Sequence, residues 1–251
     1  METELRLSEF RLDRYNAILF DLDSTILDTG AYAIDASKWI LRQSTRNWCG
    51  ILEDFIDVLV ERYHNEISTI AGGGKFKRPI DCVRDALTTS LKEFNIEPVD
   101  EILQDGLAMF RKLHVEYASP TDGLTAILDS LKTKGIKLGV ITNSFQGNAK
   151  KILSKLNLDH YFSLIADSSD YNAFKPMPEP FEFALAKLSV NKENTLYIGD
   201  EFYADVVGAI RAGLAVVWIN NRDDALEQNQ RKYGVEPTFV ISSFSELKEI
   251  M

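Results

Sequence analysis

Two acidic residues, Asp21 and Asp23, are the first in this sequence whose type and spacing suggest chemistry. They directly follow an apolar run at 16–20, and Ser24 and Thr25 come after them. A carboxylate at the end of a buried strand is unfavourable unless a cation or hydrogen-bond donors satisfy it. Magnesium suits such a pair, because proteins hold it through a few carboxylates, carbonyl groups and waters. A simpler alternative is that both residues cap a following helix.

Thr142, Asn143 and Lys175 are candidates for holding phosphate oxygens. Thr142 and Asn143 follow the apolar run at 137–141 and precede a helical pattern, so a hydroxyl, backbone amides and a helix N-terminus would meet there. Lys175 lies in a proline-rich segment, 174–180, whose backbone is restricted on both sides of it. A single rigidly placed ammonium suits a phosphoryl group as a point charge. Taken singly, these residues could equally be an ordinary turn and a surface lysine.

Asp200 and Asp205 are the last acidic candidates. Asp200 closely follows the apolar run at 196–198, and Asp205 lies early in the next helical pattern. Asp200 suits direct contact with a metal ion, whereas Asp205 could hold the waters around that ion, or Lys175, without touching the metal. Alternatively, Asp205 only stabilises a helix N-terminus. All these signals fall at strand ends in a fixed order, which favours one functional explanation over several unrelated ones.

Alternating strand and helix patterns must position these residues. The alternation predicts an α/β fold with a doubly wound, Rossmann-like parallel sheet. In such sheets ligands bind outside the carboxyl ends of the strands, where the acidic and hydroxyl residues fall. The strands are expected at 16–20, 137–141, 162–166, 196–198, 215–219 and 238–241, and the helices at 122–134, 146–156, 179–188, 203–212 and 244–250.

Residues 30–118 interrupt this alternation. They contain no good strand and carry long apolar stripes at three- and four-residue steps, as the buried face of a helix requires. The stripes lie at 31–42, 51–67, 83–94 and 102–117. They predict an α-helical cap domain at 30–118, inserted into a core domain formed by 1–29 and 119–251.

The composition narrows the partners. A formal net charge of −10 argues against nucleic acid or an anionic membrane as the main partner. No apolar stretch is long enough to span a membrane, and residues 1–16 lack the apolar centre of a signal peptide. Cys49 and Cys82 do not suggest a disulfide framework. The sequence therefore predicts a cytoplasmic protein, a monomer or homodimer, that acts on a small molecule.

The motifs resemble those of the haloacid dehalogenase-like hydrolase superfamily over essentially the whole chain. The first family motif resembles 21–25, the second Thr142, the third Lys175, and the fourth 199–200 with Asp205. The helical insertion between the first and second motifs is similar to the helical-cap phosphatase subclass, which includes phosphoglycolate phosphatase-like enzymes. Ser24 stands where many relatives have glycine.

The resemblance implies a magnesium-dependent phosphatase that hydrolyses a small phosphorylated metabolite in two steps. Asp21 would attack phosphorus and form an aspartyl-phosphate. Asp23 would protonate the leaving oxygen and then take a proton from the attacking water. Besides magnesium, three groups would neutralise the phosphoryl oxygens: the side chains of Lys175 and Thr142 and the Asn143 amide. In the family, the metal contacts the Asp21 carboxylate, the Asp23 backbone carbonyl and Asp200.

Four other functions deserve comparison. A haloacid dehalogenase would lack the second aspartate, yet Asp23 is present. A bacterial receiver domain would be about half as long and would order its motifs differently. A phosphomutase that passes the phosphoryl group to a sugar shares every motif and stays an alternative. So does a non-catalytic interaction protein, although it would be expected to have lost at least one of the key charged residues.

Substrate choice is expected to lie in the cap. The loop at 71–79 carries Lys75, Lys77 and Arg78 in an otherwise acidic protein, and it could hold a second anionic group of the substrate. An exposed loop between two helices is the simpler interpretation. The three histidines, His64, His114 and His160, lack ligand spacing and receive no role.

Overall fold

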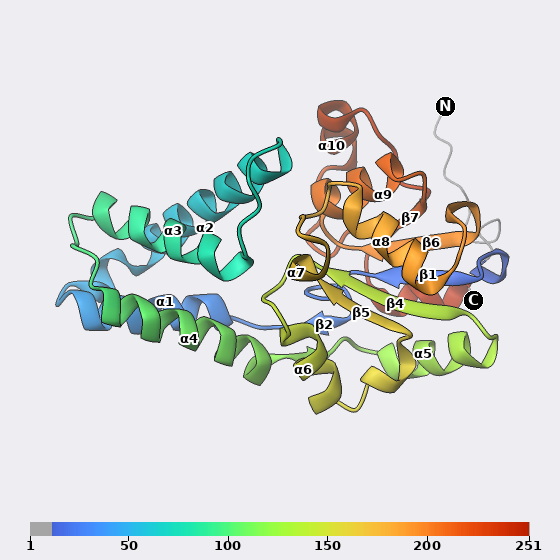
Figure 1. Ribbon diagram of the computed structural model, residues 1–251, viewed down its shortest axis with the longest axis horizontal. Coiled ribbons are helices and arrows are strands. Elements are labelled where there is room, and N and C mark those ends of the chain that lie inside the picture. The colour runs from blue at the N-terminus through green and yellow to red at the C-terminus, as the bar shows by residue number, and fades with distance from the viewer. Residues whose placement is uncertain (1–11, 251) are drawn as a thin grey trace.

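A six-stranded parallel sheet forms the centre of the computed structural model, which describes residues 12–250 (Figure 1). Residues 1–11 and 251, and with them the predicted absence of a signal peptide, lie outside the described part. The strand order is β5-β4-β1-β6-β7-β8, and all neighbours pair in parallel, which confirms the predicted doubly wound sheet. The strands are β1 (Ala17–Phe20), β4 (Lys137–Thr142), β5 (Leu164–Asp167), β6 (Thr195–Gly199), β7 (Ala215–Ile219) and β8 (Phe239–Ile241).

Both faces of the sheet are buried. Side chains alternate along β1, so that Ile18 and Phe20 join one hydrophobic cluster and Leu19 joins the other. The first cluster is completed by α5 (Leu124–Thr133), α6 (Asn148–Lys155) and a 3-10 helix at Phe244–Ile250; the second by α8 (Glu179–Leu188), a π-helical segment at Phe202–Val207 and α9 (Gly208–Arg211). Helices packed on both faces hold the strands, and with them the residues at their carboxyl ends, in place.

Four long helices form the predicted cap beside this core (Figure 1). They enclose a hydrophobic cluster of their own, and Gly106 of the fourth helix lets it approach the first closely, since a Cβ there would lie 2.4 Å from Ile40. Two short strands, β2 (Leu27–Asp28) and β3 (Ser119–Pro120), pair antiparallel where the chain passes between core and cap. The cap helices are α1 (Tyr32–Ser44), α2 (Trp48–Ala71), α3 (Pro79–Glu93) and α4 (Asp100–Tyr117).

Several local predictions differ from the structure. The helices α7 (Ser168–Tyr171) and α10 (Leu226–Tyr233) were not expected; α7 has a single turn, and α10 buries none of its residues and so shows no apolar stripe. The helix expected at 203–212 starts with the π-helical segment, and the one at 244–250 is a 3-10 helix. Among residues 12–250, no helix combines the length and apolarity that a membrane span requires.

Candidate active site

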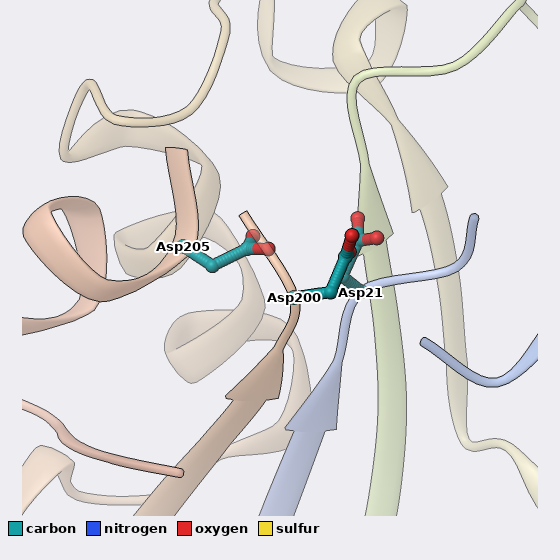
Figure 2. Close-up of side chains that lie close together, drawn as sticks. All are labelled: Asp21, Asp200 and Asp205. Carbon is teal, nitrogen blue, oxygen red and sulfur yellow. The ribbon is translucent and has the colours of Figure 1, made fainter. Parts of the chain in front are cut away.

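Three neighbouring strands bring the predicted residues together. Asp21 directly follows β1, Thr142 ends β4 and Asp200 directly follows β6; β1 lies between the other two strands. The Asp21 backbone N–H donates to the Ile198 carbonyl at 2.9 Å. This hydrogen bond fixes the backbone of the nucleophile candidate to strand β6. Figure 2 shows the Asp21, Asp200 and Asp205 carboxylates close together above these strand ends.

The three aspartates form a buried acidic cluster. Each offers an oxygen within 4.8 Å of the others, and none is more than 7% exposed. Burial is the main cause that raises the pKa of Asp21 well above its ordinary range, and the neighbouring carboxylates add to it. Burial and the charge of Asp205 raise the pKa of Asp200 to about 7. In both cases burial disfavours the ionised carboxylate, and the neighbouring carboxylates disfavour it further.

Lys175 is the buried cation of the site. Its Nζ donates to Asp21 Oδ1 at 2.5 Å, to Asp205 Oδ1 at 2.7 Å and to the Tyr197 hydroxyl oxygen at 2.8 Å. Burial alone lowers the pKa of the ammonium, but the Asp205 and Asp21 carboxylates outweigh it and raise that pKa well above its ordinary value. Lys175 therefore stays charged beside Asp21, as a group that binds phosphoryl oxygens must.

Asn143 holds the backbone of Lys175. Its Oδ1 accepts the Lys175 N–H at 2.9 Å, and its Nδ2 donates to the Lys175 carbonyl at 3.1 Å. Both Thr142 and Asn143 line the pocket above the aspartates, and the Thr142 hydroxyl accepts the Ser144 N–H at 3.1 Å. The Asn143 side chain thus has a bracing role that the sequence did not indicate, because its partner lies on a distant loop.

Asp205 accepts hydrogen bonds from three protein groups. Its Oδ1 accepts from Lys175 and from the Tyr197 hydroxyl at 2.7 Å each, and its Oδ2 accepts the Glu201 N–H at 3.0 Å. The π-helical segment delivers this side chain, and Gly199 makes room for it, since a Cβ at Gly199 would lie 2.4 Å from the Asp205 carboxyl group. Such segments are frequent at functional sites. The placement agrees with the predicted contact to Lys175.

Asp23 lies apart from the acidic cluster and faces the pocket. Its side chain is 32% exposed, and its Oδ1 lies 2.8 Å from His114 Nε2 of α4. The next residue, Ser24, has a φ of +60°, in the left-handed region that glycine adopts most easily. Asp21 and Asp23 therefore line the same pocket but have different partners: Asp21 contacts Lys175, and Asp23 contacts His114.

A pocket of about 220 Å³ lies over these groups. The cap contributes Tyr32 and Tyr63, and the core adds Phe145 and Arg222. Burial raises the pKa of both tyrosines, so they offer neutral hydroxyl groups. Arg222 donates to Asp200 Oδ2 at 2.6 Å from an exposed loop position. None of these four was predicted; only the apolar stripes that carry the tyrosines were visible in the sequence.

Two cations of the basic loop at 71–79 form salt bridges with acidic residues of the cap. Lys77 pairs with Glu66 and Asp85 at 2.7 Å each, and Arg78 pairs with Asp81 at 2.7 Å. Neither these cations nor Lys75 line the pocket. The loop instead touches the core through Phe76, whose ring centroid lies 5.3 Å from that of Phe174, the residue before Lys175. The structure thus gives the loop a docking contact and leaves anion binding by it without support.

The comparisons with known proteins agree with this geometry. A model of the haloacid dehalogenase-like hydrolase family matches residues 15–213, which include every site residue from Asp21 to Asp205. The chain belongs to this family. As the predicted family is confirmed, the protein is a haloacid dehalogenase-like hydrolase.

Named relatives of this hydrolase match it over nearly its whole length. A pyrophosphatase, PpaX, from Halalkalibacterium halodurans is 29% identical over 242 residues, 94% of this chain and 96% of that one. A phosphoglycolate phosphatase from Aquifex aeolicus is 32% identical over 238 residues, 93% and 95% of the two chains. The magnesium-bound structure of the hydrolase YfnB from Bacillus subtilis has a TM-score of 0.74 at 26% identity and covers 94% of this chain and 98% of its own.

The acidic cluster of this hydrolase fits a hard divalent cation. Asp21, Asp200 and Asp205 are three carboxylates, and the two cations that contact them, Lys175 and Arg222, leave one negative charge uncompensated when all three are ionised. Oxygen ligands at a water-accessible pocket are the set that magnesium prefers. The side chain of Asp23 points elsewhere, so any contact of Asp23 with the ion would come from its backbone carbonyl.

Magnesium is expected to stabilise this hydrolase more at high pH than at low pH. The raised pKa of Asp200, about 7, means that the metal-free fold loses stability as the pH rises from about 4 through 7, because the folded state must then carry an unfavourable charge. At a magnesium concentration of about 100 times Kd, Tm should rise by roughly 5–10 °C at about pH 8 and by much less at about pH 5. Thermal melts at both pH values measure this, and Asp200→Asn should remove most of the magnesium effect.

Proposed function

We propose that this hydrolase is a magnesium-dependent phosphatase that releases phosphate from a small phosphate monoester through an aspartyl-phosphate on Asp21. The main support is the contact between Asp21 and the buried Lys175, which sets a carboxylate beside a fixed cation at the pocket floor. The names of the two relatives, a pyrophosphatase and a phosphoglycolate phosphatase, favour phosphoryl chemistry.

The side chains of the pocket account for the proton and phosphoryl transfers of this reaction. An oxygen of Asp21 attacks phosphorus while Asp23 gives a proton to the leaving oxygen, so an alcohol departs and an aspartyl-phosphate remains. Asp23 then takes a proton from a water that attacks the same phosphorus, and phosphate leaves with Asp21 restored. The ammonium of Lys175, the Thr142 hydroxyl and the Asn143 amide bind the phosphoryl oxygens through both steps. A bound magnesium ion, held by Asp21 and Asp200, would neutralise part of the phosphoryl charge.

The pocket favours a small polar leaving group. Its volume of about 220 Å³ is below that of typical drug-sized ligand sites. Hydroxyls from Tyr32 and Tyr63 and the cation of Arg222 are the groups that such a leaving group would meet. The substrate we propose is therefore a short phosphorylated metabolite.

The remaining assignments stay predictions. We propose that cap and core divide at 29/30 and 118/119, next to the paired strands β2 and β3. Both cysteines are free thiols, as is usual in a reducing compartment. A cytoplasmic location stays a prediction. The state of assembly, monomer or homodimer, is likewise a prediction.

Phosphate release from p-nitrophenyl phosphate and from a panel of small phosphate monoesters tests the proposal. We expect turnover with magnesium, loss of turnover after chelation with EDTA, and recovery when magnesium is added back. Turnover that EDTA leaves unchanged would contradict the metal assignment. An isomeric sugar phosphate formed without free phosphate would identify a phosphomutase instead.

A further inference from the structure

His114 is a fully buried polar residue that the reaction steps above do not use. It lies in the last turn of α4, at the end of the cap nearest the core, and is 0% exposed. Its Nε2 lies 2.8 Å from Asp23 Oδ1. Within residues 12–250, no other group forms a hydrogen bond with the Asp23 carboxylate. The orientation of Asp23 therefore depends on this ring.

Asn148 determines which ring nitrogen carries the proton. The Asn148 Nδ2 lies 3.0 Å from the Arg111 carbonyl oxygen and 3.1 Å from His114 Nδ1. A carbonyl can only accept, so the NH₂ group of Asn148 must face it, and the same NH₂ then faces Nδ1. Nδ1 accepts that bond, which puts the ring proton on Nε2. His114 consequently donates to Asp23 Oδ1.

Packing fixes the ring as well as its proton. The Tyr32 and Phe145 rings lie against it, with centroids 4.8 Å and 5.6 Å away. Asn148 is the first residue of α6 and is only 1% exposed, so in the chain Asn148–His114–Asp23 the core contributes Asn148 and Asp23 and the cap contributes His114. Side chains locked in this way can hold a catalytic group to within the small tolerance that proton transfer needs.

We propose that His114 is a positioning residue that aims Asp23 for proton transfer, and that Asn148 sets the donor through which it acts. The inference rests on the proposed role of Asp23 as the acid and base of the phosphatase reaction. With Oδ1 held by Nε2–H, the other carboxylate oxygen is left to face the bound ester. The cap thereby contributes to the chemistry as well as to the walls of the pocket.

Leaving-group dependence separates this role from a merely structural one. His114→Phe keeps an aromatic ring but removes the donor. For an alkyl phosphate, whose leaving oxygen needs a proton, kcat/KM should fall at least about 10-fold more than for p-nitrophenyl phosphate, whose leaving phenolate needs none. His114→Gln, which can still donate from its amide, should recover part of the difference. A general loosening of the fold would lower kcat/KM equally for both substrates, and such equal losses would overturn the inference.

Asp23→Asn distinguishes failure of the inference from failure of the proposed function. If Asp23→Asn shows the selective loss and His114→Phe does not, the inference is wrong and the proposed function stands. If Asp23→Asn shows no selectivity, the acid role of Asp23 fails and the inference fails with it. Should His114→Phe not fold, Asn148→Ser keeps the imidazole and removes the group that fixes its proton, and it should give a smaller loss with the same selectivity.

Discussion

An Asp21→Asn variant should lose turnover by about 10⁴-fold or more on every substrate, because no other group can form the covalent intermediate. The amide has the shape of the carboxylate but is far too weak a nucleophile. Its backbone contacts, including the bond to Ile198, do not involve the side chain and should persist. The loss should appear in kcat, with substrate binding retained, since Lys175 and Thr142 remain in place.

Acid-quenched mass spectrometry gives the direct measurement. Wild-type protein mixed with substrate should gain the mass of one phosphoryl group on the peptide that contains Asp21, and the variant should gain none. Thermal melts serve as the control: the amide has the size of the carboxyl group, and Lys175 keeps its contacts with Asp205 and Tyr197, so the fold should stay intact. Wild-type levels of turnover in Asp21→Asn would refute Asp21 as nucleophile.

A Lys175→Met variant should lose both activity and stability. Removal of the ammonium takes away the cation that contacts Asp21 and Asp205, two carboxylates that are at most 7% exposed. Leaving buried charges unpaired in this way is expected to lower the free energy of unfolding by about 3–5 kcal/mol at neutral pH. Activity should fall by about 10³-fold, because the phosphoryl oxygens also lose their fixed positive charge.

The pH dependence of this loss has a definite sign. Lys175 is the group that lowers the pKa of Asp21, so without it that pKa rises further. The folded variant then binds a proton more readily than the unfolded chain, and its stability falls as the pH rises. Urea unfolding of variant and wild type should show a smaller deficit at about pH 5 than at about pH 8.

A second substitution tests the explanation. Lys175→Met combined with Asp205→Asn removes one of the unpaired charges and should recover part of the stability but none of the activity. A double variant as unstable as the single one would show that lost packing, not unpaired charge, causes the destabilisation.

Most of the fold could be predicted from the pattern of apolar residues along the sequence. The run at 215–219, and the run at 138–141 that follows the exposed Lys137, are apolar because both faces of the sheet are covered, and this is why their strands could be recognised. The pair β2 and β3 spans two residues per strand, too few for any pattern. The helix α10 carries only two apolar residues, Leu226 and Tyr233, too few for a recognisable stripe, and so it was missed as well.

Some residues of the candidate site could be predicted from the sequence, and others could not. Asp21, Thr142, Lys175 and Asp200 were found because each stands at a strand end or in a stiff loop, and strand ends of a parallel sheet meet. His114 continues the buried face of Leu103, Leu107 and Phe110 at helical spacing, so its burial was predictable. Its contact with Asp23 was not, because it depends on how the cap rests on the core. The same holds for Arg222 and Tyr63.

Two of the contacts between cap and core differ in their distance from the paired strands β2 and β3. His114 lies in the last turn of α4, next to this connection. Phe76 lies on the loop between α2 and α3 and contacts Phe174 of the core. If the cap swings about the connection, the contact near this pivot moves little, and the contact farther from it separates first. Asp23 would then stay aligned while the cap opens. Each new substrate would meet a proton donor already aimed, and the time between turnovers would be set by uncovering the pocket, with no reassembly of the acid.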